Sequence, residues 1–213
     1  MEDAMEPLTE AALDSTLHVI YRRRAVRSYE PTPLAEGVVR DLLDAAVHAP
    51  TAMHMEPWAF VVVQDPAVLQ RISDRAKALM IEKETEHRHL INAPGASPAG
   101  KHLSMLWDRS FNIFYNAGTL IVICAKPLGA FVTADCWLAA QTLMLAACAM
   151  ELGTCPVGFA VPVLNTPEMK ELLGIPAAMT AVAPIIAGHP RGAGVPVSRH
   201  APEVLRWIRP PAT

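Results

Sequence analysis

The sequence predicts an α+β fold in which a small central mixed β-sheet is flanked by helices. Long segments with helical spacing alternate with a few short runs of β-branched residues. Of the 213 residues, 52% are hydrophobic, which is enough to form a substantial buried core. Neither an internal repeat nor a linker divides the sequence. We therefore expect one domain over residues 1–213.

The N-terminal part is predicted to contain two helices followed by a strand. The first helix is expected from about Thr9 to Arg23. The second is expected from Ala35 to His48, where apolar residues recur on one helical face, and Pro50 stops it. The β-branched run Phe60–Val63 predicts a buried strand.

A third helix and a loop are expected next. Asp65-Pro66 begins a helix that continues towards His87, with proline in its first turn. The glycine- and proline-containing segment from His87 to Lys101 predicts a mobile loop, within a lid region of about residues 80–112. His87 and His89 flank an arginine, so a solvated or substrate-facing lid is favoured over a metal site there.

The C-terminal half is predicted to alternate strands with helices. The expected elements are a strand at Thr119–Ala125, a helix at Asp135–Leu152, a strand at Cys155–Val161, a helix at Thr166–Gly174 and a strand at Thr180–Ala187. The long apolar helix contains Gln141 and is too short for comfortable spanning of a membrane, which favours a buried central helix. Gly153 is expected to stop that helix.

Composition excludes several classes of protein. A net charge of −3 argues against nucleic-acid binding, which requires a broad basic face. The acidic start, without an apolar segment after it, predicts no signal peptide, and hence a cytoplasmic protein that binds no membrane. Four cysteines without CxxC spacing predict buried, reduced thiols. A mean hydropathy of +0.24 is high for a soluble monomer and suggests an extensive subunit interface.

An arginine-rich segment, Arg22-Arg23-Arg24-Ala25-Val26-Arg27, is the sharpest local feature. Four guanidinium groups within six residues repel one another unless an anion or an acidic partner lies among them. Arginine binds phosphate in a planar, bidentate geometry, so the segment is a candidate phosphate site. A solvated basic helix end remains the alternative.

Three further segments are candidates for a ligand site, and each also has a purely structural interpretation. The loop Ala49–Trp58 holds small, polar and aromatic groups between two prolines, as suits a flat heteroaromatic ring, or it is a turn followed by a core anchor. Gly153–Phe159 allows close backbone approach to a ligand, or it is a helix cap and an ordinary strand. Arg199 is a fourth candidate, although a lone arginine near the terminus is normally solvent-exposed.

Taken together, the order and spacing of these features resemble the flavin-dependent nitroreductase family over Tyr21 to Trp207. The residues that carry the resemblance are Arg23-Arg24-Ala25-Val26-Arg27 with Tyr29, Ala49-Pro50-Thr51, Glu56-Pro57-Trp58, Glu151-Leu152-Gly153, Leu173-Gly174-Ile175-Pro176, Gly188-His189-Pro190 and Arg199 before Trp207.

The resemblance implies a homodimer that binds two FMN molecules at its interface, with the long buried helix in that interface. One subunit would hold the FMN phosphate, and the partner would supply the proline-bracketed loop. The implied cofactor-binding positions are Arg23, Arg24, Ala25, Arg27 and Arg199 at the phosphate, Pro156, Val157 and Gly158 along the isoalloxazine ring, and Pro50, Thr51, Ala52, His54 and Glu56 in the partner's loop.

The implied reaction is a ping-pong transfer of hydride from NADH or NADPH, through flavin N5, to a small electron-poor acceptor such as a nitroaromatic or a quinone. No catalytic side chain is assigned. Cys155 lies next to the expected ring, where it contacts N5 or is an inert buried thiol.

The sequence also departs from the family pattern. Ala25 replaces a serine that often contacts the phosphate, while His54 and Glu56 resemble the iodotyrosine deiodinase branch. Met80 and Glu84 stand where that branch grips its amino-acid substrate with Glu and Tyr. A specialised reaction, such as reductive dehalogenation, flavin fragmentation or dehydrogenation, and a non-enzymatic flavin-binding module therefore stay open.

Overall fold

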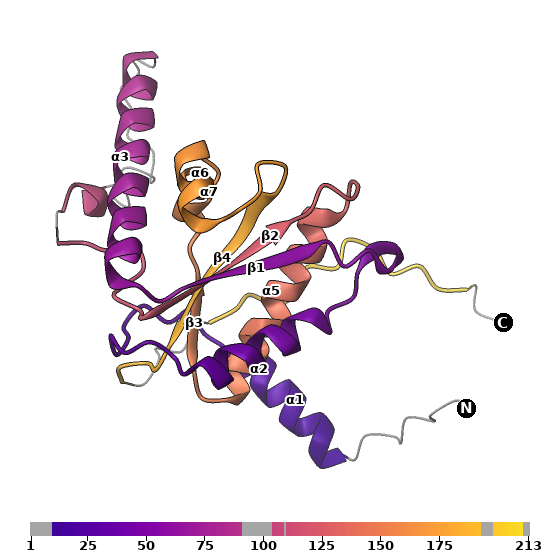
Figure 1. Ribbon diagram of the computed structural model, residues 1–213. Coiled ribbons are helices and arrows are strands. Elements are labelled where there is room, and N and C mark those ends of the chain that lie inside the picture. Colours follow the sequence, from indigo (N-terminus) through magenta and orange to yellow (C-terminus); the bar gives the residue numbers. More distant parts are fainter. Residues whose placement is uncertain (1–9, 91–103, 109, 193–197, 211–213) are drawn as a thin grey trace.

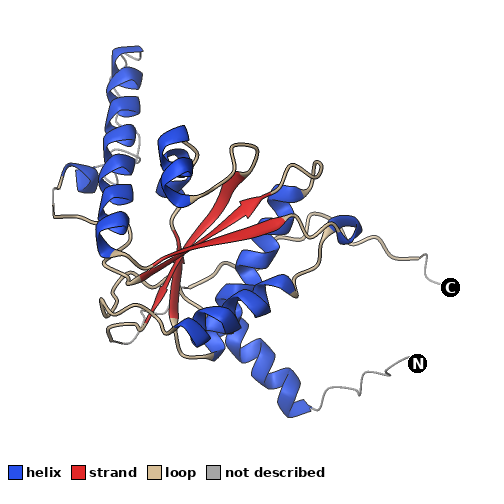
Figure 2. Ribbon diagram, viewed as in Figure 1, coloured by secondary structure: helices blue, strands red, loops and turns tan. Residues whose placement is uncertain are grey.

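Four strands in the order β1-β2-β4-β3 form the centre of the fold, with helices on both faces (Figures 1 and 2). The structure is a computed structural model that describes residues 10–90, 104–108, 110–192 and 198–210. The elements are α1 (Glu10–Arg22), α2 (Glu36–Val47), η1 (Ala52–His54), β1 (Trp58–Val63), α3 (Pro66–Leu90), η2 (Ser104–Trp107), β2 (Thr119–Ala125), α5 (Val132–Ala149), β3 (Gly153–Pro156), η3 (Gly158–Ala160), α6 (Val161–Leu164), α7 (Pro167–Leu173) and β4 (Thr180–Gly188).

The central strand β2 shows why the sheet needs two helical layers. All seven of its residues are buried, and successive side chains point to opposite faces. Leu120 and Val122 enter one hydrophobic cluster, whereas Ile121 and Ile123 enter the other. A continuous apolar run of this kind is typical of a strand that is covered on both sides.

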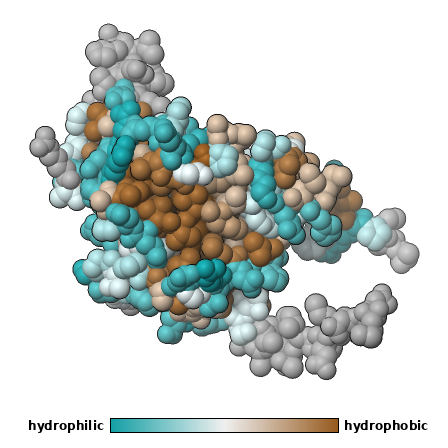
Figure 3. Space-filling view, in the orientation of Figure 1, coloured by the Kyte–Doolittle hydropathy of each residue, from teal (hydrophilic) through white to brown (hydrophobic). Residues whose placement is uncertain are grey.

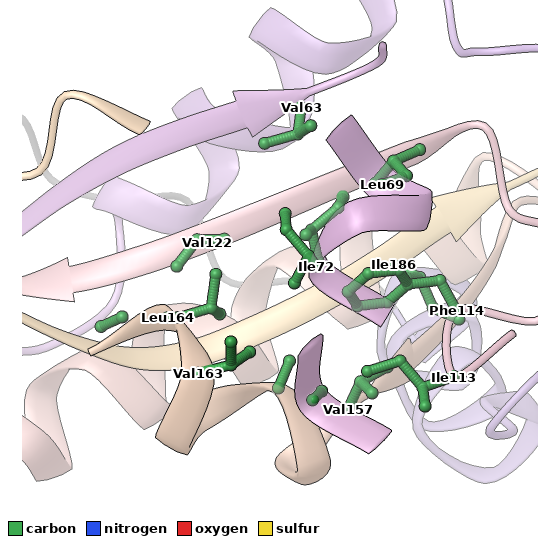
Figure 4. Packing of buried hydrophobic residues seen from close by; sticks show 14 of the residues in the cluster. Val63, Leu69, Ile72, Ile113, Phe114, Val122, Val157, Val163, Leu164 and Ile186 are labelled. Carbon is green, nitrogen blue, oxygen red and sulfur yellow. The ribbon is translucent and has the colours of Figure 1, made fainter. Parts of the chain in front are cut away.

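Each face of the sheet has its own helical layer. On one face, α3, α6 and α7 cover the cluster shown in Figure 4, where Ile72 of α3 and Leu164 of α6 lie against Val122 and Ile186 of the sheet. On the other face, α2 and α5 pack against each other and against the sheet. The predicted α+β architecture, a small sheet flanked by helices, is thereby confirmed.

The long helix α5 is buried along one side. Cys136, Ala139, Leu143 and Ala147 recur every three or four residues and are inaccessible to solvent. α5 is long and apolar enough to cross a membrane, by length and composition alone, and 44% of it is buried inside the protein. On its other side, Trp137 and Leu138 are 39% and 44% exposed.

The strands differ from the prediction in three respects. The four strands pair antiparallel, and the parallel pairing expected of a mixed sheet is confined to an isolated bridge between Ala25 and Thr154. β1 is an outer strand and only partly buried. Figure 3 shows an apolar area over the sheet between α3 and α2. The strand expected at Cys155–Val161 instead covers Gly153–Pro156 and gives way to η3 and α6.

The helices also differ at their ends. α3 continues to Leu90, so the loop predicted from His87 does not begin there, and the first part of the predicted lid region is helical. Residues 91–103 of that region, and the side chains of His87 and His89, lie outside the described residues. α5 begins at Val132 and ends at Ala149, before the predicted stop at Gly153.

Candidate functional site

The arginine-rich segment lies along the edge of the sheet, beside β3. Ala25 forms a parallel bridge with Thr154, and the Val26 N–H donates to the Thr154 carbonyl at 2.9 Å. The chain that follows pairs with the end of β4, where the Glu30 N–H donates to the His189 carbonyl at 2.9 Å. Two of the features singled out in the sequence, the arginine segment and Gly153–Phe159, are therefore brought together.

Gly153 makes this close approach possible. A Cβ atom at Gly153 would lie 2.9 Å from three side-chain atoms of Val26, closer than real Cβ contacts come. Gly153 was expected to cap α5, but the left-handed residue after that helix is Glu151, with φ of 60°. The glycine is needed for packing against the arginine segment rather than for stopping the helix.

The four arginines have different surroundings. Arg22 donates to the carbonyl of Cys148 near the end of α5, at 2.7 Å, and Arg24 donates to the carbonyls of Tyr21 and Arg23. Arg23 and Arg27 both lie close to Cys155 of β3. Burial raises the pKa of the Cys155 thiol, while Arg27 and Arg23 act in the opposite direction. A concentration of positive charge thus lies beside the start of β3.

Two cavities adjoin Arg23 and Arg27. The smaller, of about 210 Å³, is lined by Arg22, Arg23 and Arg24 together with Gly153 and Thr154. The larger, of about 570 Å³, is lined by Arg27, by polar residues of the chain between Asp108 and Asn116, and by Arg191. The Arg191 guanidinium also lies 3.1 Å from the Glu30 carboxylate. Thr154 belongs to the predicted segment Gly153–Phe159, although it was not singled out within it. Arg191 is a site residue that the sequence motifs did not identify, because it stands out neither by type nor by spacing.

The proline-bracketed loop of residues 50–56 has an unusual backbone. Met53, His54 and Glu56 have φ values of 55°, 52° and 43°, in the left-handed region that side-chain-bearing residues rarely adopt. The loop is fixed to α5, because the buried Asp135 carboxylate accepts the Ala52 N–H at 3.2 Å. Asp135 was not expected at the site, and an acidic residue at the start of an apolar helix was the available signal. Sterically strained backbone of this kind is concentrated at functional sites.

Within the chain, the loop lies far from the arginine segment. β1 begins at Trp58, which pairs with Ala125 of β2, and Ala125 in turn pairs with Thr180, the first residue of β4. β3 begins at Gly153, which pairs with Gly188, the last residue of β4. Strand spacing and rise put these two positions about 30 Å apart, at opposite edges and opposite ends of the sheet. The structure therefore does not bring the loop residues Pro50, Thr51, Ala52, His54 and Glu56 to the arginine segment of the same chain.

The remaining predicted positions are placed as follows. Pro156 is the last residue of β3, and the Val157 N–H donates to the Pro184 carbonyl at 2.9 Å, which leads the chain into the exposed Gly158. Arg199 lies on the exposed segment 198–210, which has no regular secondary structure.

Comparison with known proteins gives a consistent result. Residues 20–189 match the Nitroreductase family. A putative NADH dehydrogenase/NAD(P)H nitroreductase of Archaeoglobus fulgidus is 26% identical over 184 residues, covering 84% of this chain and 87% of the relative. The iodotyrosine deiodinase of Danio rerio is 41% identical over 64 residues, 30% of this chain and 20% of the fish protein.

A solved structure has the same fold. The crystal structure of a nitroreductase with bound FMN from Bacteroides fragilis superposes with a TM-score of 0.72, at 21% identity, over 91% of this chain and 97% of the other.

Proposed function

The chain belongs to the nitroreductase family, and from this premise we propose that it is an FMN-dependent oxidoreductase. It passes hydride from NADH or NADPH to a small electron-poor acceptor such as a nitroaromatic or a quinone. The single observation that carries the proposal is the pairing of the arginine segment with Thr154 of β3, beside cavities that Arg23 and Arg27 line. The Bacteroides fragilis nitroreductase, which has FMN bound in its crystal structure, supports the choice of flavin.

The arginine segment suits the phosphate of FMN. Guanidinium groups bind phosphate through paired, charge-assisted hydrogen bonds. We propose that Arg23, Arg24 and Arg27 hold that phosphate, with Arg199 reaching it from segment 198–210. Ala25 stands where a serine hydroxyl would add one more donor.

The other residues act on the ring of the cofactor. Bound FMN supplies the hydride transfer, through its N5 position. The backbone at Pro156, Val157 and Gly158 supports one side of the ring, since the exposed Gly158 offers close approach without a side chain. The chain itself thus binds and orients the reacting groups, and the larger share of the chemistry belongs to the cofactor.

We propose that the protein is a homodimer in which each FMN contacts both subunits. About 30 Å of sheet separates the arginine segment from the loop 50–56, so one FMN molecule reaches both only if the loop comes from the partner. Exposed apolar side chains support an interface, because isolated surfaces rarely carry so many. They include Phe131, Trp137 and Leu138 at α5, and Leu205, Trp207 and Ile208 in segment 198–210.

The visible absorption spectrum of the purified protein tests the proposal, before and after anaerobic addition of NADH or NADPH. We expect oxidised-flavin bands that bleach on addition and return when nitrobenzene or a quinone is supplied. A protein that remains colourless and fails to bind added FMN would contradict the proposal. A flavin that no nicotinamide reduces would favour the non-enzymatic module.

Arginine variants test the assignment of the phosphate site. We expect Arg23→Ala and Arg27→Ala each to weaken FMN binding by about 10- to 100-fold, as measured by quenching of flavin fluorescence. Arg40→Ala is the matched control, because Arg40 lies on α2 in an exposed pair with Glu36. Equal affinity in all three variants would refute the assignment.

One observation favours a second candidate, reductive dehalogenation: the local 41% identity to the Danio rerio deiodinase. Release of halide from a halotyrosine by the reduced protein would support it. Faster turnover of a quinone, without halide release, would favour the first candidate.

A further inference from the structure

We infer that Asp135 is a positioning residue that fixes the loop 50–56 in the conformation in which it meets the flavin of the partner subunit. The inference rests on the proposed function for the role of the loop, but not for the contact itself. The Asp135 Oδ1 atom accepts the Ala52 N–H at 3.2 Å, across a gap of 83 residues in the sequence.

Burial of the Asp135 carboxylate lowers the stability of the folded protein unless hydrogen-bond donors compensate it. The residue is 4% exposed and lies in the first turn of α5. A buried carboxylate destabilises a protein unless donors surround it. Here, the Ala52 N–H supplies one donor, and the positive end of the helix dipole favours a negative charge in the first turn.

Side-chain packing does little to fix the conformation of loop 50–56. Ala52 directly precedes Met53 and His54, whose left-handed φ values of 55° and 52° are strained for residues with side chains. Met53 is 89% exposed, and His54 and Met55 are also exposed, so packing contributes little to fixing them. The hydrogen bond to Asp135 is therefore a fixed point at the start of the strained turn.

The same helix links this fixed point to the proposed interface. Trp137 and Leu138, two and three residues after Asp135, are 39% and 44% exposed on α5. A loop that is bonded to α5 moves with that helix. Its approach to the partner's flavin is then set by how α5 docks, rather than by the loop alone.

Three variants test separately the acceptor oxygen of Asp135, the charge of its carboxylate and the N–H donor of Ala52. Asp135→Ala removes the acceptor, and Asp135→Asn keeps an oxygen acceptor while removing the charge. Ala52→Pro removes the N–H donor. Proline fits at the first position of η1, and Thr51 before it has φ of −130° and ψ of 149°, the extended conformation that a residue before proline prefers.

We expect Asp135→Ala and Ala52→Pro each to raise the Kd for FMN about tenfold or more and to change the visible circular dichroism of the bound flavin. The double variant should be no weaker than either single variant, because both remove the same contact. Asp135→Asn should bind FMN within about threefold of the wild type, because the contact is kept. Asp41→Ala, at an exposed carboxylate of α2, is the matched control and should leave all readouts unchanged.

Amide exchange in the flavin-free protein provides a readout that does not depend on the proposed function. The Ala52 amide should exchange slowly in the wild type and in Asp135→Asn, and at least tenfold faster in Asp135→Ala. Wild-type affinity in Asp135→Ala, equal weakening by Asp135→Asn, or additive effects of Asp135→Ala and Ala52→Pro would overturn the inference. Failure of the wild type to bind FMN, with the exchange pattern intact, would refute the proposed function but leave the contact established.

Discussion

At the edge of β3, Gly153 allows the arginine segment to come into contact with the sheet. A helix followed by a glycine predicts a helix cap, and that interpretation was wrong because the determining contact is with Val26, which is remote in the sequence. A local pattern contains no information on such a contact. By contrast, Gly174 was predicted to close α7 from local pattern alone, and it does so with a left-handed φ of 66°.

Gly153→Ala should therefore impair the cofactor site rather than the fold as a whole. The new Cβ would displace Val26 and with it Arg23 and Arg27, so we expect about tenfold weaker FMN binding with an unchanged far-ultraviolet spectrum. Adding Val26→Gly should recover much of the affinity. Gly37→Ala is the control, since a Cβ there meets nothing within 4 Å. Wild-type affinity in Gly153→Ala would show that the close approach is dispensable.

The raised pKa values of two buried cysteines, Cys124 and Cys136, predict how the free energy of unfolding depends on pH. Burial raises the pKa of Cys124 from 9.0 to about 11. For Cys136, burial first, then Cys124 and Asp135, raise the pKa from 9.0 to about 12. The folded protein therefore holds these protons more tightly than the unfolded chain. The resulting stabilisation is complete below pH 9 and is lost as the pH rises through the folded values.

We expect the free energy of unfolding to fall above pH 9, by about 1.4 kcal/mol per pH unit for each thiol. Urea denaturation at a series of pH values from 8 to 10.5 measures this slope. Cys136→Ala, which keeps the site apolar, should show a shallower slope than the wild type. An identical slope in the variant would mean that other groups cause the loss.

Among the elements, prediction succeeded where one segment contains its own determinants. β2 was predicted at Thr119–Ala125 and is found there. A short continuous run of apolar residues is typical of a strand that is covered on both faces, so the segment itself contains the signal. β3 was predicted to extend to Val161, but it ends at Pro156, which cannot donate to a ladder, and the chain turns into η3. α3 extended past the predicted end because its polar residues do not prevent a helix from continuing.

The cap of α7 provides a stability prediction for a single element. The Thr166 hydroxyl accepts the Met169 N–H at 3.3 Å and donates to the Val163 carbonyl at 2.8 Å, which joins α7 to α6. Thr166→Ala should lower the free energy of unfolding by about 1 kcal/mol. Chemical denaturation measures the change, with Thr133→Ala as a control at an exposed threonine of α5. A loss as small as that of the control would show that the cap contributes little.

At the scale of the whole molecule, the sequence predicted the architecture better than the site. The α+β fold follows from the spacing of apolar residues, since each helix and strand buries its own face. The site depends on which distant segments meet. The arginine segment does meet β3, whereas loop 50–56 lies at the far end of the sheet. Asp135 was missed because its partner, Ala52, is close only in the folded chain.

The separation of the arginine segment from loop 50–56 has a genetic consequence. If each flavin site takes one part from each subunit, two defective chains can complement one another in a mixed dimer. A chain with Arg23→Ala and Arg27→Ala still has an intact loop, and a chain with His54→Ala and Glu56→Ala still has intact arginines. Their mixed dimer has one site built wholly of wild-type parts and one built wholly of altered parts. The two chains can carry different tags, so that the mixed dimer is purified through both. The mixed dimer should bind about one FMN, although neither parent homodimer retains FMN. Binding of no FMN by the mixed dimer would indicate that each site belongs to a single chain.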